Sequence, residues 1–295
     1  MRLGGRRQSR NVEDRRGQRG TAGRGRGGGI PIFSGGKISI GTIVIALIAW
    51  LAFGVNPLQF LGSVDTADYS QSPVSQRGTT GELTDAEGVF VAQVLGTTED
   101  IWSEQFRLNQ LGGYKEPRLV LYSGATRTAC GLGQGAMGPF YCPSDQTIYL
   151  DLEFFRDTGK RMGVRGDFAQ GYVIAHEVGH HVQRVLGILE QTQSAQQRAS
   201  QRQANQISVL TELQADCFAG IWAHELQKEG DTIDEKDIRD AMNAAAAVGD
   251  DRIQQNSQGY VVPDSFTHGT SAQRVQWFTT GLQSGSLQAC NTFSG

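Results

Sequence analysis

The chain has 295 residues and a mass of 32.0 kDa, with 38% hydrophobic residues, 19% charged residues and a mean hydropathy of -0.34. These values are typical of one water-soluble globular domain with appendages, and they exclude a collagen-like, fibrous or multi-span protein. The formal net charge is -3, but nine arginines and Lys37 lie before residue 38 against only Glu13 and Asp14. A basic N-terminal segment therefore precedes an acidic body.

The N-terminal residues 1–37 are rich in arginine and glycine and have almost no apolar side chains. Such a segment cannot bury enough surface to offset its chain entropy, so the sequence predicts a disordered basic tail. Runs of arginine and glycine can bind the phosphates of RNA or of anionic lipids. A solvated tail is the simpler interpretation, and we do not expect a nucleic-acid partner.

Residues 38–55 read ISIGTIVIALIAWLAFGV and carry no charge. A helix of this length spans about 27 Å, close to the hydrocarbon thickness of a lipid bilayer. We expect one transmembrane helix; a buried core helix and a cleaved signal peptide are the alternatives, although no clear cleavage site follows. The positive-inside rule then predicts that residues 1–37 lie in the cytoplasm and that the acidic body lies on the outer face of the membrane. Residues 56–80 are mostly polar and predict a linker.

The body, residues 81–295, has strand-like segments before a helical region. Residues 84–87 are typical of a helix start, whereas residues 118–124 (RLVLYSG) and 147–152 (TIYLDL) have β-type composition. Helical patterns dominate after Asp167. Because strands cluster before helices, the sequence predicts an α+β domain, mainly helical with a small sheet, preceded by the transmembrane helix.

The sequence HEVGH, from His176 to His180, lies in a helical stretch. Two histidines at i and i+4 lie one turn apart on the same face, so their imidazoles can converge on one Zn²⁺. Glu177 lies beside the first histidine, where it can take a proton from a water activated by the metal without ligating the metal itself. The pattern predicts a hydrolytic zinc site with His176 and His180 as ligands and Glu177 as general base.

A catalytic zinc needs a third protein ligand. The metzincin pattern requires Gly and His at two later positions, where this chain has Gln183 and Leu186, so that pattern is excluded. Farther along, Glu212 and Asp216 lie at i and i+4 in the mostly apolar helical stretch TELQADCFAGIWAHEL. We predict that Glu212 ligates the metal and that Asp216 accepts the N–H of a ligand histidine. Two solvated carboxylates are the alternative.

HEVGHH followed by ELQAD resembles the gluzincin arrangement and is similar to the bacterial neutral zinc metallopeptidase family of membrane-anchored proteins. The resemblance covers residues 81–293, including ACGLGQGAMGPFYCPSDQTIYLDL and FTHGTSAQRVQWF. It implies a zincin-like domain that binds one Zn²⁺ per chain and cleaves peptide or protein substrates. With the expected transmembrane helix, it also implies a single-pass protein of the bacterial inner membrane whose catalytic domain lies in the periplasm. It also implies the zinc ligands His176, His180 and Glu212, with Glu177 as the base.

Three further histidines have other expected roles. His181 lies on a different helix face from the ligand pair, so we expect it to pack or cap, and for His224 we expect core packing or a surface position. His268 lies in a loop beside glycine, where it can stabilise a developing oxyanion. The resemblance to gluzincins with a late histidine also supports a catalytic role for His268. Arg274 is expected to be a structural ion-pair partner.

The glycines of GLGQGAMG lie between Cys130 and Cys142 and are interpreted as turn residues, with TIYLDL beyond them as an edge strand for substrate. In an oxidising compartment the four cysteines can form disulfides. Cys130 and Cys142 bracket a short loop, which leaves Cys217 and Cys290. Three connectivities are possible, and we expect Cys130–Cys142 and Cys217–Cys290.

The alternative function is a catalytically silent, membrane-tethered zinc-binding module that docks a protein partner. In such a protein the metal would only hold the fold. Glu177 separates the two hypotheses, because a purely structural zinc site has no need of a carboxylate between its histidines.

Overall fold

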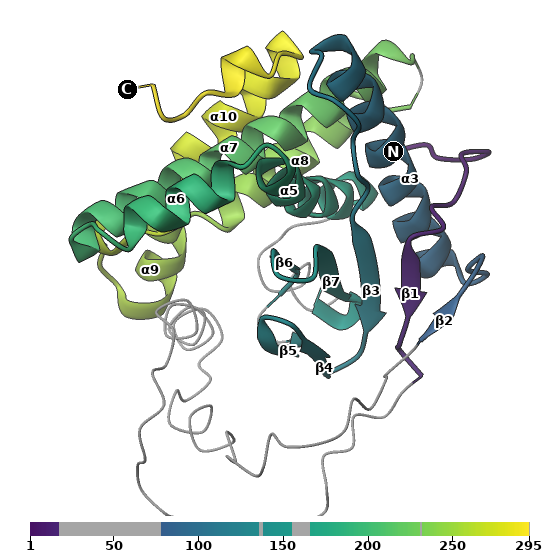
Figure 1. The fold of residues 1–295 in the computed structure, drawn as a ribbon, viewed down its shortest axis with the longest axis horizontal. Coiled ribbons are helices and arrows are strands. Elements are labelled where there is room, and N and C mark those ends of the chain that lie inside the picture. Colours follow the sequence, from purple (N-terminus) through teal and green to yellow (C-terminus); the bar gives the residue numbers. More distant parts are fainter. Residues whose placement is uncertain (18–77, 136–137, 155–165, 231, 295) are drawn as a thin grey trace, which may run out of the picture.

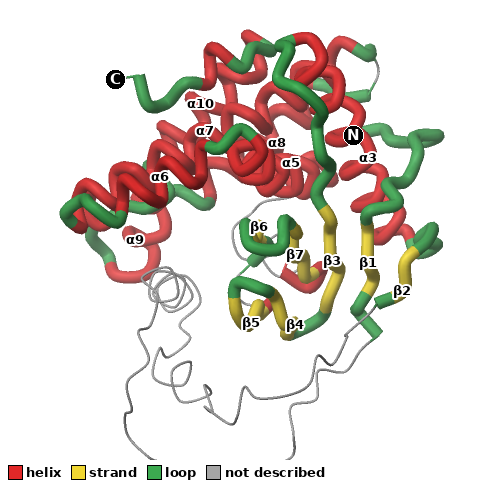
Figure 2. Tube along the Cα trace, in the orientation of Figure 1, coloured by secondary structure: helices red, strands yellow, loops and turns green. Residues whose placement is uncertain are grey.

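The structure, a computed structural model, describes residues 1–17, 78–135, 138–154, 166–230 and 232–294. Its helices form a layer against one face of a small sheet (Figures 1 and 2). The longer helices are α3 (Ala86–Leu108), α5 (Asp167–Val185), α6 (Ile188–Gln196), α7 (Gln201–Lys228), α8 (Glu235–Ala247), α9 (Asp250–Gln258) and α10 (Ser271–Ser284). The strands are β1 (Val12–Asp14), β2 (Thr79–Thr80), β3 (Arg118–Tyr122), β4 (Ala125–Thr128), β5 (Gly131–Gln134), β6 (Phe140–Cys142) and β7 (Thr147–Asp151).

The main sheet has the strand order β2-β1-β3-β7-β6, in which β1, β3 and β7 are parallel and the two outer strands are antiparallel. Successive side chains of a strand point to opposite faces. Leu119 and Leu121 of β3 belong to the main core, whereas Val120 and Tyr122 belong to a smaller apolar cluster. In the strand order β7 lies between β3 and β6, so it is an interior strand. The prediction that TIYLDL forms an edge strand is therefore wrong. The edge strand at this end is β6.

Residues 1–17 belong to the folded domain, so the prediction of a disordered tail is wrong for this part of the segment. Val12 is 2% exposed in β1, which pairs with both β2 and β3. The α-amino group of Met1 lies 2.6 Å from Asp237 Oδ1. The rest of the predicted tail, residues 18–37, lies outside the described residues, as do residues 56–77 of the predicted linker.

Within residues 1–17, arginines of the basic N-terminal segment pair with acidic residues of the body. Arg7 Nη1 lies 2.8 Å from Glu99 Oε2, and Arg16 Nη2 lies 2.7 Å from Asp85 Oδ2. Glu99 is 1% exposed and also accepts a hydrogen bond from the Ser9 hydroxyl. Arginines that suggest a solvated tail in the sequence thus make ion pairs across the fold.

The predicted membrane topology is also wrong. Among the residues that the structure describes, no helix has both the length and the apolar character needed to cross a membrane. Residues 38–55, for which the sequence predicts such a helix, lie outside the described residues. Within the described residues, β1 of the predicted cytoplasmic segment pairs with β3 of the body, so these two parts cannot lie on opposite sides of a membrane. What is confirmed of the fold class is the mainly helical domain with a small sheet.

Helices α5, α7 and α10 pack closely at glycines, and this packing positions the polar residues described below. A Cβ at Gly179 of α5 would lie 2.9 Å from the carbonyl oxygen of Ala215 in α7. A Cβ at Gly281 of α10 would lie 1.9 Å from the carbonyl oxygen of Cys217. No other residue allows backbones to approach so closely without rearrangement.

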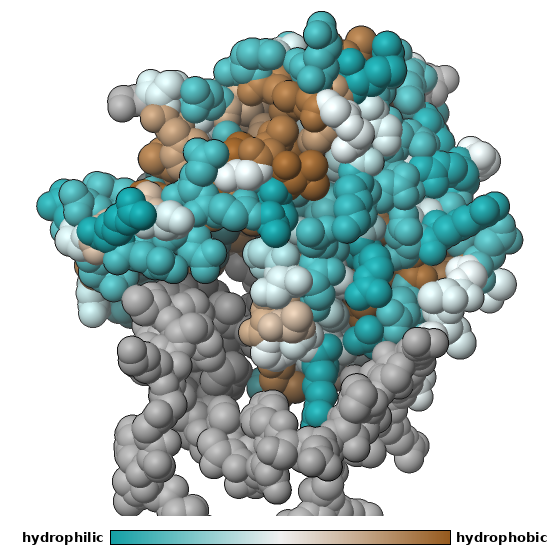
Figure 3. All heavy atoms as spheres, in the orientation of Figure 1, coloured by the Kyte–Doolittle hydropathy of each residue, from teal (hydrophilic) through white to brown (hydrophobic). Residues whose placement is uncertain are grey.

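The two expected disulfides are confirmed: Cys130 pairs with Cys142, and Cys217 pairs with Cys290. The second links α7 to the C-terminal segment. Beside this segment lies a groove of about 820 Å³, and Figure 3 shows hydrophobic side chains gathered on this part of the helical layer. The apolar residues that line it are Leu111, Leu186, Ile188, Ile207, Phe218, Leu287 and Phe293.

We expect Val12→Asp to lower the free energy of unfolding by at least about 2 kcal/mol, because it buries an unpaired carboxylate in the sheet. The matched control is Arg10→Asn at an exposed position two residues away, which should leave stability nearly unchanged. Chemical denaturation of the full chain measures both. Equal unfolding midpoints for the two variants would contradict a folded N-terminal segment.

Candidate metal centre

The residues of HEVGH occupy the middle of α5, where His176 and His180 lie one turn apart. Their ring centroids are 4.8 Å apart. Glu212 reaches them from α7, with its Oε2 lying 3.2 Å from His176 Nε2 and its Oε1 lying 3.4 Å from His180 Nε2. One ligand atom from each of the three residues lies within 4.8 Å of the others. The structure therefore brings the three predicted ligands together.

The donor set fits a zinc ion. Two imidazole nitrogens and one carboxylate oxygen are typical of a catalytic zinc site, which keeps its fourth position open. Zinc bonds of about 2.0–2.1 Å in tetrahedral geometry place neighbouring ligand atoms about 3.4 Å apart. The contacts of Glu212 with the two histidines are close to this value, at 3.2 Å through Oε2 and 3.4 Å through Oε1, and a cation would draw together the three ligand atoms, which lie within 4.8 Å of one another.

A buried carboxylate contacts His176 at Nδ1, the ring nitrogen that does not face Glu212. Asp216 Oδ1 lies 2.9 Å from His176 Nδ1 and accepts a hydrogen bond from the Tyr172 hydroxyl at 2.5 Å. Arg274 donates to both carboxylate oxygens, at 2.8 and 2.9 Å. Burial alone would raise the pKa of Asp216, but Arg274 and His176 outweigh it and hold that pKa below its usual range. The ionised carboxylate accepts the Nδ1 proton, so Nε2 is left to face the candidate metal position.

His180 has a different partner, which the sequence analysis did not identify. Its Nδ1 lies 2.9 Å from the side-chain oxygen of Gln183, a residue with no exposed surface. In the sequence, Gln183 served only to exclude the metzincin pattern. Its position three residues after His180 in a helix was the signal that could have identified it.

Glu177 is 7% exposed and lies next to His176 on α5. Burial raises its pKa, and the nearby His176 and His180 oppose this rise. It is not among the three residues whose ligand atoms converge. Glu177 is thus a buried carboxylate next in sequence to a candidate ligand and outside the converging set.

His268 lies in the loop between α9 and α10, which packs on α7. A Cβ at the adjacent Gly269 would lie 3.3 Å from Leu213, the neighbour of Glu212. Asp250 orients the loop by accepting backbone N–H groups, including that of His268 at 2.6 Å, and its Oδ1 lies 3.3 Å from His268 Nδ1. Burial lowers the pKa of His268, but Asp250 and Glu212 outweigh it and raise this pKa. The sequence analysis identified His268 and missed Asp250.

The other two histidines lie away from the three converging ligands. The His181 ring lies 3.0 Å from the Tyr141 hydroxyl and 2.6 Å from the carbonyl oxygen of Lys115. Burial lowers its pKa to about 4, so it is neutral at physiological pH. His224 Nδ1 lies 2.7 Å from the carbonyl oxygen of Leu282. His181 therefore ties the edge strand β6 to α5, and His224 ties α7 to α10.

The charges of the site make metal binding depend on pH. Burial lowers the pKa of His176, but Asp216 and Glu212 outweigh it and raise this pKa to about 10. Burial raises the pKa of Glu212, but the two histidines outweigh it and hold this pKa well below its usual range. A cation that binds between these residues displaces a proton from His176, so its affinity increases with pH.

Comparison with known proteins places the whole chain in one group. The family model described as "Putative neutral zinc metallopeptidase" matches residues 1–293. A protein of Escherichia coli named "Uncharacterized protein YpfJ" is 49% identical over 298 residues, covering 99% of each chain. "Uncharacterized protein Rv2575" of Mycobacterium tuberculosis is 46% identical over 194 residues, covering 62% of this chain and 64% of its own. No solved structure matches.

Replacing Asp216 with Asn should lower the free energy of unfolding of the metal-free protein by about 3–5 kcal/mol, because it leaves the buried Arg274 without a counter-charge. The pKa of Asp216 is lowered by folding, so this contribution is present above about pH 4 and is lost as the pH falls through the folded pKa. Denaturant titration at several pH values measures the difference between wild type and variant.

The control is Asp240→Asn, which removes an ion pair with the exposed Lys236. Solvent screens that pair, so we expect a much smaller loss of stability. Equal losses for the two variants, or a loss for Asp216→Asn that persists unchanged in acid, would contradict the role assigned to the buried pair.

Proposed function

The chain belongs to the family described as "Putative neutral zinc metallopeptidase", and from this premise we propose that it is a zinc-dependent peptidase with Glu177 as its general base. One observation carries the proposal: one ligand atom from each of His176, His180 and Glu212 lies within 4.8 Å of the others, in a donor set typical of zinc. Glu177 is buried and lies between the two histidines in the sequence. It does not belong to the three residues whose ligand atoms converge. This arrangement suits hydrolysis better than a metal that only holds the fold.

When bound, Zn²⁺ supplies a Lewis acid that polarises a peptide carbonyl and makes water more acidic. The chain's own residues supply the proton transfers. Glu177 accepts a proton from the attacking water, and its raised pKa makes it able to pass that proton to the leaving amine. Asp216 keeps the proton on Nδ1 of His176, so that Nε2 stays available as a ligand.

His268 is proposed to stabilise the negative charge that develops on the carbonyl oxygen. Asp250 lies at its Nδ1, which leaves Nε2 as the donor toward substrate. The hydrogen bond with Asp250 favours the protonated form of this ring, and in the metal-free protein the charge of Glu212 also favours it. A pre-positioned donor of this kind strengthens its hydrogen bond as the oxyanion forms.

The substrate is proposed to be a peptide or protein segment in extended conformation. Within the described residues, β6 pairs only with β7 and is the outer strand next to the helical layer. The hydrogen bond between Tyr141 of β6 and His181 of α5 holds this edge against the helix that carries the candidate ligands. An extended peptide can add to such an edge through main-chain hydrogen bonds.

Glu177→Gln should keep nearly one zinc per chain and lower peptide cleavage by several orders of magnitude, because the amide cannot accept the proton. His176→Ala, His180→Ala and Glu212→Ala should each lose zinc. Zinc content and cleavage of an unfolded casein are measured on the same purified proteins. An active Glu177→Gln enzyme would refute the mechanism, and a zinc-loaded wild type that cleaves no peptide would favour the silent module.

His268→Ala should keep its zinc and lower kcat by about 10²–10³-fold, the usual effect of removing one oxyanion donor. The matched control is His224→Ala, whose ring bonds to the carbonyl oxygen of Leu282 at the far end of α10 and which should cleave like wild type. Steady-state kinetics on both variants tests this. A normal kcat for His268→Ala would remove His268 from the mechanism.

A further inference from the structure

We propose that Gln183 is a positioning residue for His180, and that a chain of buried amide groups ending at the carbonyl of Cys290 fixes its direction. The proposal rests on the proposed function in one respect, because it takes His180 to be a metal ligand. It assigns the C-terminal segment a role in zinc binding, although this segment contains no candidate ligand.

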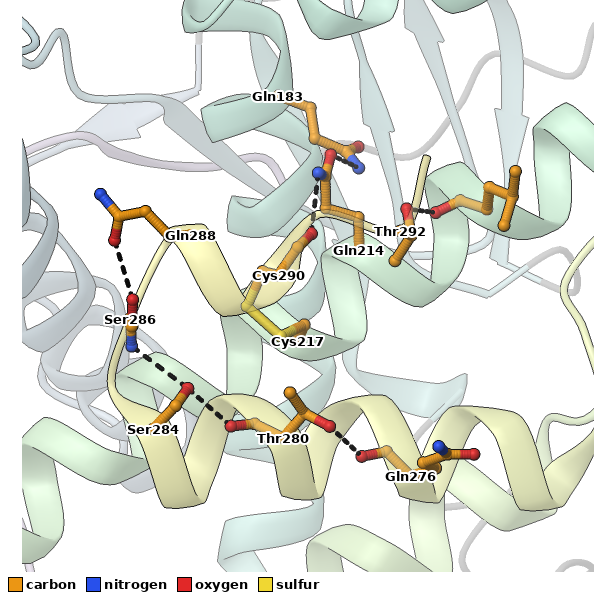
Figure 4. Close-up of a disulfide and its surroundings, with 11 residues drawn as sticks. Gln183, Gln214, Cys217, Gln276, Thr280, Ser284, Ser286, Gln288, Cys290 and Thr292 are labelled. Atoms are coloured by element: carbon orange, nitrogen blue, oxygen red, sulfur yellow. Dashed lines mark hydrogen bonds between the residues drawn. A yellow bond between two sulfur atoms is a disulfide. The ribbon is translucent and has the colours of Figure 1, made fainter. Parts of the chain in front are cut away.

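The chain of contacts runs through the helical layer from α5 to the C-terminal segment. Gln183 Oε1 lies 2.9 Å from His180 Nδ1, and Gln183 Nε2 lies 3.0 Å from Gln214 Oε1 and 2.7 Å from the carbonyl oxygen of Thr211. Gln214 Nε2 then donates to the carbonyl oxygen of Cys290 at 3.0 Å, as Figure 4 shows. Gln183 and Cys290 have no exposed surface, and Gln214 is 5% exposed.

Backbone carbonyl groups fix which atom donates in each hydrogen bond of this series of amide groups. A backbone carbonyl can only accept, so Gln214 must turn its NH₂ group to Cys290 and its oxygen to Gln183. Gln183 in turn directs its NH₂ group to Gln214 and Thr211, which leaves its oxygen facing His180.

An amide oxygen also only accepts, so Nδ1 of His180 must carry the proton. In the neutral ring, the lone pair then lies on Nε2, the atom that faces Glu212 at 3.4 Å. This is the tautomer that can bind a metal through Nε2. The amide chain therefore selects the ligand form of His180 through contacts that begin at Cys290.

The two ligand histidines are thus supported by different chemistry. Behind His176 lies an ionised carboxylate paired with Arg274, whereas behind His180 lies a chain of neutral amides. A neutral chain depends on geometry alone, because no charge holds its members together. The anchor at its end therefore matters more for His180 than for His176.

That anchor is held by the disulfide between Cys217 and Cys290. Cys217 follows Gln214 by three residues in α7, which is about one helical turn. The disulfide therefore holds the carbonyl oxygen of Cys290 close to the Gln214 NH₂ group from which it accepts a hydrogen bond. The hydroxyl of Thr292 also donates to the carbonyl oxygen of Leu210 at 2.7 Å. Breaking the disulfide is expected to release the terminal acceptor and to weaken zinc binding without altering any ligand.

The first test compares Gln183→Met with Gln183→Glu in the full-length protein. Both variants lose the donors to Thr211 and Gln214, but only the glutamate keeps an acceptor for His180. Competition with a chromophoric chelator should show zinc affinity about 10- to 100-fold weaker for Gln183→Met, and a smaller loss for Gln183→Glu. The control Gln105→Met, at a buried glutamine of α3, should bind zinc like wild type.

Three further measurements separate positioning from a loss of folding. The unfolding midpoint of each metal-free variant is measured, and the Co²⁺-substituted Gln183→Met protein should show altered visible bands because a ligand has turned. If Gln183→Met does not fold, Gln214→Met interrupts the same chain one residue farther from the ligand and should also weaken zinc binding. Unchanged affinity and unchanged bands in the folded variant would overturn the proposal.

The disulfide is tested with matched pairs of substitutions. Cys217→Ser with Cys290→Ser should weaken zinc affinity, whereas Cys130→Ser with Cys142→Ser, which removes the disulfide on the sheet side, should not. Equal affinities for the two would contradict the anchoring role. A wild-type protein that binds no zinc would refute the proposed function itself, whereas normal zinc binding with no effect of Gln183→Met would refute only the positioning role.

Discussion

The ion pair between Asp216 and Arg274 is the interaction on which the arrangement of the site depends. It is buried on both sides, with Asp216 fully inaccessible and Arg274 3% exposed. A buried ion pair destabilises the fold unless both partners are fully hydrogen-bonded. Here Tyr172 and His176 contact the Asp216 carboxylate, and Arg274 donates to both of its oxygens. Since these residues come from α5, α7 and α10, the pair sets the relative positions of the three helices and, with them, of His176 and Glu212.

Close backbone packing makes this pairing possible. Gly179 lets α5 approach α7 at Ala215, and Gly281 lets α10 approach α7 at Cys217. The disulfide at Cys217 and the carboxylate of Asp216 are neighbours in α7, so one short segment of that helix carries the charged support of His176 and the anchor of the amide chain behind His180. The site is in this sense built around α7, although the recognisable motif lies on α5.

Much of the site could be predicted from the sequence, because helical periodicity places His176 and His180 on one helix face and Glu212 and Asp216 on one face of another, and the need for a third zinc ligand predicts that these faces meet. Asp250 could not be, since its partners in the His268 loop lie 17–19 residues farther along the chain. Gln183 lies only three residues after His180, so its spacing could have revealed that contact, but not its contacts with Thr211 and Gln214. The N-terminal strand β1 was missed because its three residues are held by pairing with β2 and β3, and arginines before and after it pair with acidic residues of the body, none of which local composition shows. Local composition likewise favoured β7 as the edge strand, whereas the pairing of β6 with β7 buries it.

The central claim is that this chain cleaves peptide bonds with one zinc ion held by His176, His180 and Glu212. The most direct measurement is the cleavage rate of metal-depleted protein during titration with Zn²⁺, using an unfolded protein substrate. The account predicts no cleavage without metal and a rate that rises to a plateau at one equivalent of zinc per chain. Full activity in the metal-depleted protein, or no cleavage at any zinc concentration, would contradict it.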